Sequence, residues 1–104
     1  LTQVGVTMGT PLYMSPEQCT GQELSPASDI YTLGIVSYQM ICGRHPYESS
    51  SVVEIMTNHC DPSKFPDSLT DLRPDIAGVI QLNQAIFRMV ATDPNKRFQS
   101  TEEV

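Results

Sequence analysis

Residues 30–43 contain no charged residue, and their apolar side chains point in every direction around a 3.6-residue period. Ser25 precedes it as a good N-cap, Pro26 suits the first helical position, and Gly43 is a suitable terminator. The pattern predicts a central helix over residues 26–43 that is covered on all sides. Because the stretch is shorter than the ~20 apolar residues needed to cross a bilayer, we expect a core helix and not a membrane span.

Three capping boxes predict further helix starts, because a Ser at the N-cap and a Glu or Gln three residues later satisfy each other's backbone N–H groups. They are residues 15–18 (SPEQ), 51–54 (SVVE) and 100–103 (STEE). We expect a short first helix that ends near Gly21 and a second that runs to about His59. The third would open at the last residues of the chain, as expected of a chain that has been truncated.

The remaining residues divide into loops and one more helix. Apolar residues recur at helical spacing over residues 76–91, which predicts an amphipathic helix with Gly78 as a possible break. Residues 1–14 show no sustained helical or strand period, and residues 60–74 contain three prolines and three aspartates, so both are predicted to be loops. No internal repeat or second domain boundary is visible. We therefore predict an all-α fold of five helical pieces around the central helix.

The composition argues against nucleic-acid binding, a disulfide scaffold and a metal site. The net charge of −6 and the absence of Lys and Arg before Arg44 argue against a nucleic-acid surface, which needs a basic face. The three cysteines have an odd count and no Cys-x-x-Cys spacing, which favours a reduced intracellular setting over a disulfide scaffold. His45 stands alone and His59 is followed directly by Cys60, so no four-ligand zinc set is apparent and we expect no metal site.

Three motifs, in this order, resemble the C-terminal lobe of a Ser/Thr protein kinase. Residues 9–17, GTPLYMSPE, resemble the end of the activation segment with its Ala-Pro-Glu motif, in which Ser15 replaces the alanine. Residues 29–34 (DIYTLG) with residues 43–47 (GRHPY) resemble the kinase helix F and the turn after it. Residues 93–97, DPNKR, resemble the link between helices H and I. The SPEQ run and residues 97–100, RFQS, resemble bacterial Ser/Thr kinases most.

The resemblance implies a domain organisation. Residues 1–104 would be part of a protein kinase domain, from within the activation segment to the start of helix I. Residues 1–14 would be the activation segment and substrate loop, and residues 15–104 a helical subdomain. The fold would then be the C-terminal half of the large kinase lobe, packed around the central helix.

The resemblance also implies roles for the first residues. Thr10 would support catalysis and help to orient the substrate hydroxyl. Without the family resemblance, it would be an ordinary loop threonine. The shelf for the substrate residue after the phosphoacceptor would consist of Pro11, Leu12, Tyr13 and Met14. Thr2 and Thr7 lie where activation segments are phosphorylated in relatives, and the alternative is an unmodified terminus.

Three charged residues match structural positions of the family. Glu17 and Arg97 would form a buried ion pair between the activation segment and the H–I link, with a planar guanidinium binding a carboxylate at two points. From spacing alone, Glu17 is equally explained by the helix dipole and Arg97 by solvation. Asp29 matches the residue that receives backbone N–H groups of the catalytic loop. Because that loop is not in this sequence, we expect Asp29 to be hydrated or partnered differently.

The catalytic motifs themselves are not in the sequence. It contains no G-x-G-x-x-G, no His-Arg-Asp and no Asp-Phe-Gly, and its first lysine is Lys64. We therefore expect this chain alone to bind no ATP and to transfer no phosphate. The parent kinase would transfer the ATP γ-phosphoryl group to protein Ser or Thr residues with Mg²⁺.

Two alternatives stay open. The chain could be a non-catalytic, pseudokinase-like interaction module, or an unrelated small helical bundle, which a contact between Glu17 and Arg97 would exclude. The expected partners are protein substrates, with no nucleic acid and no membrane contact by this segment. Apolar surface left open by missing parts of the lobe would allow self-association. The expected location is cytoplasmic, either free or as the intracellular domain of a membrane-anchored kinase.

Overall fold

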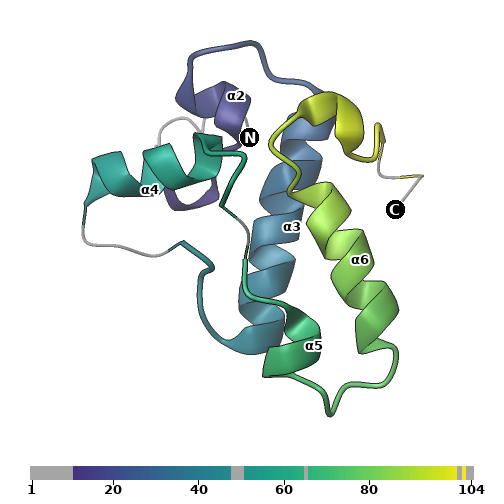
Figure 1. The fold of residues 1–104 in the computed structure, drawn as a ribbon. Helices are drawn as coiled ribbons and strands as arrows, with labels where there is room; N and C mark the ends of the chain where they lie inside the picture. The colour runs from purple at the N-terminus through teal and green to yellow at the C-terminus, as the bar shows by residue number, and fades with distance from the viewer. Residues whose placement is uncertain (1–10, 48–50, 65, 101, 103–104) are drawn as a thin grey trace.

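The computed structural model describes residues 11–47, 51–64, 66–100 and 102, and within them the chain is all-helical. The elements are η1 (Pro11–Tyr13), α2 (Pro16–Cys19), α3 (Pro26–Cys42), α4 (Val52–Cys60), α5 (Leu69–Leu72), α6 (Val79–Met89) and η2 (Pro94–Lys96). The long helix α3 runs through the middle, with α6 along one side and α2 and α4 toward the other (Figure 1). In the part of the chain that the structure describes, no helix is long and apolar enough to cross a membrane.

The predicted helix starts are present where the capping signals lie. The Ser15 hydroxyl accepts the Gln18 N–H (3.3 Å), and the Gln18 side chain accepts the Ser15 N–H (2.7 Å), so the first capping box is confirmed. The Ser51 hydroxyl accepts the Glu54 N–H at 3.2 Å and begins α4. At the other end of α3, the N–H of Gly43 bonds to the carbonyl of Gln39 at 2.8 Å, which ends the helix as predicted.

The main core lies between α3, α5 and α6. Its fully buried members are Ile30, Tyr38, Leu69, Val79, Ile86 and Met89. The two long helices approach closely at Gly34, where an added Cβ would lie 2.7 Å from Cγ1 of Val90 and 2.9 Å from Cβ of Met89. Both distances are well inside van der Waals contact, so only glycine allows α3 and the end of α6 to pack this tightly. A second cluster of Tyr31, Ile35 and Val90 lies beside it.

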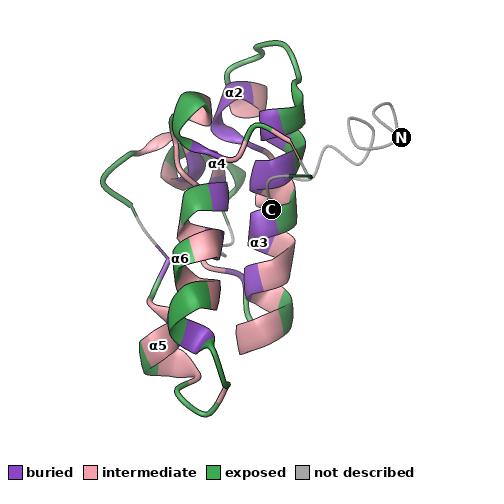
Figure 2. Cartoon of the chain, turned by 90° about the vertical axis from the view of Figure 1, so that its right-hand side faces the viewer, coloured by how far each residue is buried: buried purple, intermediate pink, exposed green. Residues whose placement is uncertain are grey.

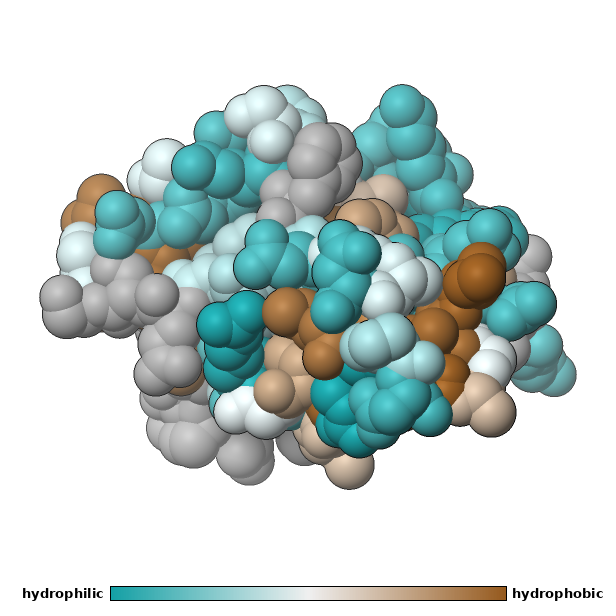
Figure 3. Space-filling view, turned by 60° about the horizontal axis from the view of Figure 1, so that its bottom comes forward, coloured by the Kyte–Doolittle hydropathy of each residue, from teal (hydrophilic) through white to brown (hydrophobic). Residues whose placement is uncertain are grey.

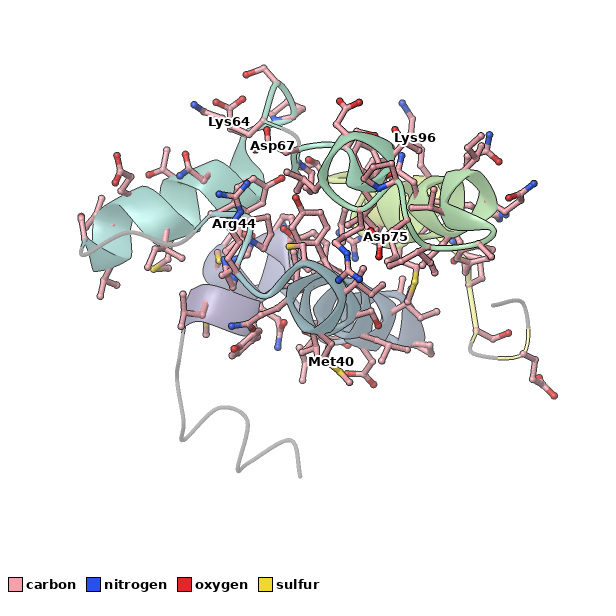
Figure 4. The ribbon with its side chains drawn as sticks, turned by 90° about the horizontal axis from the view of Figure 1, so that it is seen from below. Met40, Arg44, Lys64, Asp67, Asp75 and Lys96 are labelled. Carbon is pink, nitrogen blue, oxygen red and sulfur yellow. The ribbon has the colours of Figure 1, made fainter. Side chains whose placement is uncertain are left out.

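The prediction that the central helix is covered on all sides is wrong for this chain. Leu33 is 44% exposed, Met40 is 79% exposed, and Asp29 is also exposed, so one side of α3 is open. Figure 2 shows the buried and open sides of the helix, and Figure 4 shows Met40 pointing away from the other helices. A helix with apolar residues on every face is expected to be buried, but the pattern does not show whether the segments that cover each face belong to the same chain.

Two further predictions are corrected between α4 and α6. The segment 60–74 is not a continuous loop, since α4 includes Cys60 and a single turn, α5, begins after Ser68, whose hydroxyl accepts the Thr70 N–H at 3.2 Å. The helix predicted from residue 76 begins only at Val79, because Gly78 adopts a left-handed φ of 75° that interrupts helical geometry. The helix predicted to open at Ser100 falls mostly outside the described residues.

Candidate functional site

The side chain of Arg97, which follows η2, is buried beside the first turn of α3 and binds Glu17 of α2. Arg97 Nη1 lies 2.8 Å from Glu17 Oε2, and Arg97 Nη2 lies 2.9 Å from Glu17 Oε1. The side chains of Arg97 and Glu17 are 0% and 7% exposed. The carboxylate also accepts the hydroxyl proton of Ser28, in the first turn of α3, at 2.6 Å. Two segments far apart in the sequence are therefore joined by a bidentate ion pair out of contact with water.

The remaining N–H groups of the same guanidinium bind backbone carbonyls. Arg97 Nε donates to the carbonyl of Ala91 (2.6 Å), Nη1 to that of Ala27 (3.0 Å) and Nη2 to that of Thr92 (3.1 Å). With the two bonds to the carboxylate, all five donors of the guanidinium are satisfied. The guanidinium carbon also lies 4.9 Å from the centre of the Tyr31 ring. Arg97 thus connects α2, α3 and the segment after α6.

The protonation of Glu17 follows from this environment. Burial acts to raise the pKa of the Glu17 carboxyl, but the hydrogen bonds from Arg97 and Ser28 outweigh it and hold that pKa below its usual value of 4.5. The carboxyl is therefore ionised near neutral pH and forms a true ion pair. Both charged groups are buried and fully paired, which is the chemistry of a structural contact.

A second cluster holds the backbone of η1, which precedes α2. His45, in the turn after α3, and His59 of α4 both place Nε2 within hydrogen-bonding distance of the carbonyl oxygen of Leu12; the distance from His59 is 3.0 Å. A carbonyl oxygen can only accept, so each imidazole carries a proton on Nε2. One backbone oxygen of the predicted substrate shelf is therefore bound by two separate parts of the fold.

The other ring nitrogens are also paired. His45 Nδ1 accepts the Tyr47 N–H at 2.9 Å, and His59 Nδ1 lies 2.6 Å from the buried Tyr31 hydroxyl. Burial raises the pKa of Tyr31 well above its usual value, so this hydroxyl keeps its proton and donates it. Both imidazoles are then neutral in this arrangement. Since the Tyr31 ring also lies beside Arg97, this residue connects the two clusters.

Tyr13, the last residue of η1, is tied directly to α3. Its carbonyl accepts the hydroxyl proton of Thr32 at 2.6 Å, and its own hydroxyl donates to Oε1 of Gln39 at 2.6 Å. The backbone of η1 is therefore fixed by α3, by α4 and by the turn after α3. Each of these contacts comes from a residue distant in sequence.

The structure brings together some of the predicted site residues and leaves others apart. Glu17 and Arg97 are in contact, which excludes the reading of the chain as a bundle without this pair. Asp29 lies exposed in the first turn of α3 and forms no ion pair with any described residue. Thr2, Thr7 and Thr10 lie outside the described residues. Among the shelf residues, Leu12, Tyr13 and Met14 are partly buried, and Pro11 opens η1.

Sequence reasoning missed the two histidines and Thr32. It weighed His45 and His59 only as metal ligands, whereas the described residues hold no group of three or more His, Cys, Asp or Glu side chains arranged to bind a metal. The residues next to them in the sequence give little signal, since His45 lies between Arg44 and Pro46 and His59 between Asn58 and Cys60. Their common target is a backbone carbonyl, which has no sequence signature.

The surface of the described residues carries exposed apolar side chains and an exposed ion pair. The exposed large apolar residues are Leu24, Leu33, Met40, Val52, Val53 and Ile80. On the face drawn in Figure 3, apolar residues reach the surface among hydrophilic ones and gather most on one side. Arg44 and Asp67 form an exposed ion pair at 3.6 Å that joins the turn after α3 to the segment before α5 (Figure 4).

Comparison with known proteins places this arrangement in a family. Residues 2–104 match the protein kinase domain family. The chain is 35% identical to the serine/threonine-protein kinase PknA of Corynebacterium glutamicum over 100% of the chain and 21% of that protein. It is 38% identical to the serine/threonine-protein kinase pkn3 of Myxococcus xanthus over 98% of the chain and 18% of that protein. The chain thus spans about a fifth of the length of these curated relatives.

A solved structure supports the fold. The twitchin kinase region of C. elegans superposes with a TM-score of 0.74 at 22% identity, over 88% of this chain and 15% of that one. The all-α fold predicted as part of the large kinase lobe is therefore confirmed, and so is the resemblance to bacterial Ser/Thr kinases. From the family match over nearly its whole length, the chain belongs to the protein kinase family.

Proposed function

We propose that this chain is the substrate-binding and structural part of a Ser/Thr protein kinase. Residues 1–14 are assigned to the activation segment, with Thr10 and the shelf of residues 11–14 facing the protein substrate. Residues 15–104 form the helical support. Groups outside this sequence would bind ATP and Mg²⁺ and transfer the γ-phosphoryl group, since the sequence has neither a Gly-rich loop nor the catalytic aspartates.

The observation that carries the proposal is the fixed backbone of η1. A loop that aligns a peptide for reaction must be held in one geometry before the peptide arrives, because misplacement by an ångström lowers the rate strongly. Here the Leu12 carbonyl is bound by His45 and His59, and the Tyr13 carbonyl by Thr32. Two buried histidines and the half-buried Thr32, from three separate parts of the fold, therefore support the shelf, as expected of a preorganised binding loop.

The other assignments follow the same proposal. The Glu17–Arg97 pair would anchor the end of the activation segment to the link after α6. Asp29 and the open side of α3 would face the catalytic loop of the complete lobe, and in its absence this side would allow self-association. Thr2 and Thr7 would be phosphorylation sites. The kinase would act in the cytoplasm, where ATP and protein substrates are available.

The test removes one support of the shelf in the whole protein. Thr32→Val keeps the shape of the side chain but cannot donate to the Tyr13 carbonyl. We expect KM for a Ser- or Thr-containing peptide to rise roughly two- to tenfold, the equivalent of about 0.5–1.5 kcal/mol for one hydrogen bond, with KM for ATP unchanged. The measurement is phosphate transfer from labelled ATP, with peptide and ATP varied in turn.

The matched control is Thr57→Val. Thr57 is exposed in α4, and its hydroxyl also donates to a backbone carbonyl, that of Val53, at 2.8 Å. We expect both KM values to stay unchanged in this variant. If Thr32→Val altered KM for ATP and left that for peptide unchanged, the shelf assignment would be wrong. If the whole protein transferred no phosphate at all, the non-catalytic alternative would replace the enzyme.

A further inference from the structure

Two of the three cysteines meet where α2 and α4 pack side by side (Figures 1 and 2). Cys19 is the last residue of α2, and Cys60 is the last residue of α4. The Cys60 thiol donates to the carbonyl of Pro16, the first residue of α2, with the sulfur 3.7 Å from the oxygen. Cys19 and Cys60 also line the same hollow in the surface. The two cysteines therefore lie at one contact between helices although they are far apart in sequence.

The pair is accessible from outside. Both cysteines are half-buried with free thiols, and both line a shallow hollow in the surface together with Met56, Thr57 and Asp61. A molecule as small as hydrogen peroxide fits such a hollow. The third cysteine, Cys42, lies at the far end of α3, where its thiol donates to the Arg44 carbonyl at 3.3 Å. Access and proximity thus single out one pair among the three thiols.

We propose that Cys19 and Cys60 are a redox modification site, at which hydrogen peroxide converts the two thiols into a reversible disulfide that links α2 to α4. Both residues end their helices, where the backbone adjusts more readily than inside a helix. Small backbone adjustments and rotation of the two side chains would bring the sulfur atoms to bonding distance. No part of this inference depends on the proposed kinase function.

The chemistry balances with peroxide as the oxidant. The thiolate of one cysteine attacks the peroxide O–O bond, which breaks to give a sulfenic acid and hydroxide, and hydroxide takes up a proton to become water. The second thiol then attacks the sulfenic sulfur. The S–S bond forms, the S–O bond breaks, and the leaving hydroxide takes the thiol proton and departs as a second water. Two thiols are oxidised, and one peroxide is reduced to two waters.

The order of the two steps follows from the surroundings of Cys19. Burial, with the nearby Cys60, raises the pKa of the Cys19 thiol to about 12, so Cys19 has very little thiolate with which to attack peroxide. We therefore assign the first attack to Cys60 and the second to Cys19. This order predicts that the sulfenic acid forms on Cys60.

The experiment uses the whole protein, first reduced and then treated with hydrogen peroxide, and maps the links by mass spectrometry. Cleavage after Arg and Lys and after Glu separates the three cysteines, which fall in residues 18–23, 24–44 and 55–64. We expect a linked pair of the peptides 18–23 and 55–64 that is lost on treatment with dithiothreitol. The oxidised protein should also melt at a higher temperature than the reduced one, because the link closes a long loop in the unfolded chain.

Variants give matched controls. Cys42→Ser should still form the linked pair. Cys19→Ser should form none and should instead give a sulfenic acid on Cys60 that reacts with dimedone, while its circular dichroism spectrum stays that of the unaltered protein. Linkage through Cys42, or oxidation of Cys60 to sulfinic acid without any linked peptide, would overturn the inference. So would complete resistance of both thiols to peroxide.

Discussion

The ion pair of Glu17 and Arg97 allows a quantitative test of what the buried charges contribute. In Glu17→Gln the side chain keeps its size, but the guanidinium of Arg97 stays 0% exposed and loses its counter-charge. Breaking a buried pair by removing one partner costs about 3–5 kcal/mol. We expect the free energy of unfolding to fall by an amount in that range, because Arg97 is bound to three segments and cannot move out to water without breaking three bonds to carbonyls.

Removing the other partner should cost more. Arg97→Met leaves the buried Glu17 carboxylate, which still accepts from Ser28, without its cationic partner, and it also leaves the carbonyls of Ala27, Ala91 and Thr92 without this donor. Each unpaired buried polar group costs about 1–3 kcal/mol. The double variant should lose less stability than the sum of the two single variants, since it contains no unpaired charge at this position.

The matched control is the exposed pair of Arg73 and Asp75. It is also a two-point pair, with Arg73 Nε 3.0 Å from Asp75 Oδ1 and Nη2 2.9 Å from Oδ2, but its side chains are 41% and 64% exposed. Asp75→Asn should therefore change stability far less than Glu17→Gln, because water solvates the charge that remains. The assay is urea unfolding followed by far-UV circular dichroism. Equal losses in the two variants would refute the reasoning, since burial is the main difference between the pairs.

Three more predictions come from single groups. Gly34→Ala should lower stability by about 1–3 kcal/mol in urea unfolding, because its Cβ would overlap Val90 and Met89; an unchanged midpoint would show that α6 can move away. Glu17 has a lowered pKa in the folded state, so its contribution is fully present above the unfolded pKa near 4.5 and is lost as the pH falls through the lower folded value. Between neutral and acid pH, the melting temperature should therefore fall further for the unaltered protein than for Glu17→Gln. His59→Phe should cost about 1–3 kcal/mol, because the buried Tyr31 hydroxyl loses its acceptor while His45 still binds the Leu12 carbonyl, and unaltered chemical denaturation would contradict the assigned hydrogen bonds.

Local signals explain which parts of the fold the sequence predicts well. The capping box at Ser15 and the hydroxyl of Ser51 act within one helical turn, so their residue types are sufficient to locate the starts of α2 and α4. The single turn α5 has a local cap at Ser68, but it is too short to show a periodic pattern, and a distant contact also holds it, in which the Leu69 N–H donates to Asn83 Oδ1 at 2.8 Å. The start of α6 was placed too early because a periodic pattern does not reveal that Gly78 adopts a left-handed φ.

The candidate site divides in the same way. Family motifs pointed to Glu17 and Arg97 as partners, although nothing in their spacing requires contact. The support of η1 by two histidines and Thr32 was not predicted, because a backbone carbonyl accepts a bond from any suitably placed donor. The proximity of Cys19 and Cys60 could not be predicted from the sequence either, since the two residues belong to different helices.

The sequence by itself determined the helical class, most helix starts and the kinase motifs, because caps and periodicity act over a few residues. The tertiary structure alone decided which side of α3 is open, which donors hold the Leu12 carbonyl and which cysteines meet. These features depend on where helices distant in sequence come to lie against one another. Packing of whole helices sets that placement, and no short stretch of residues encodes it.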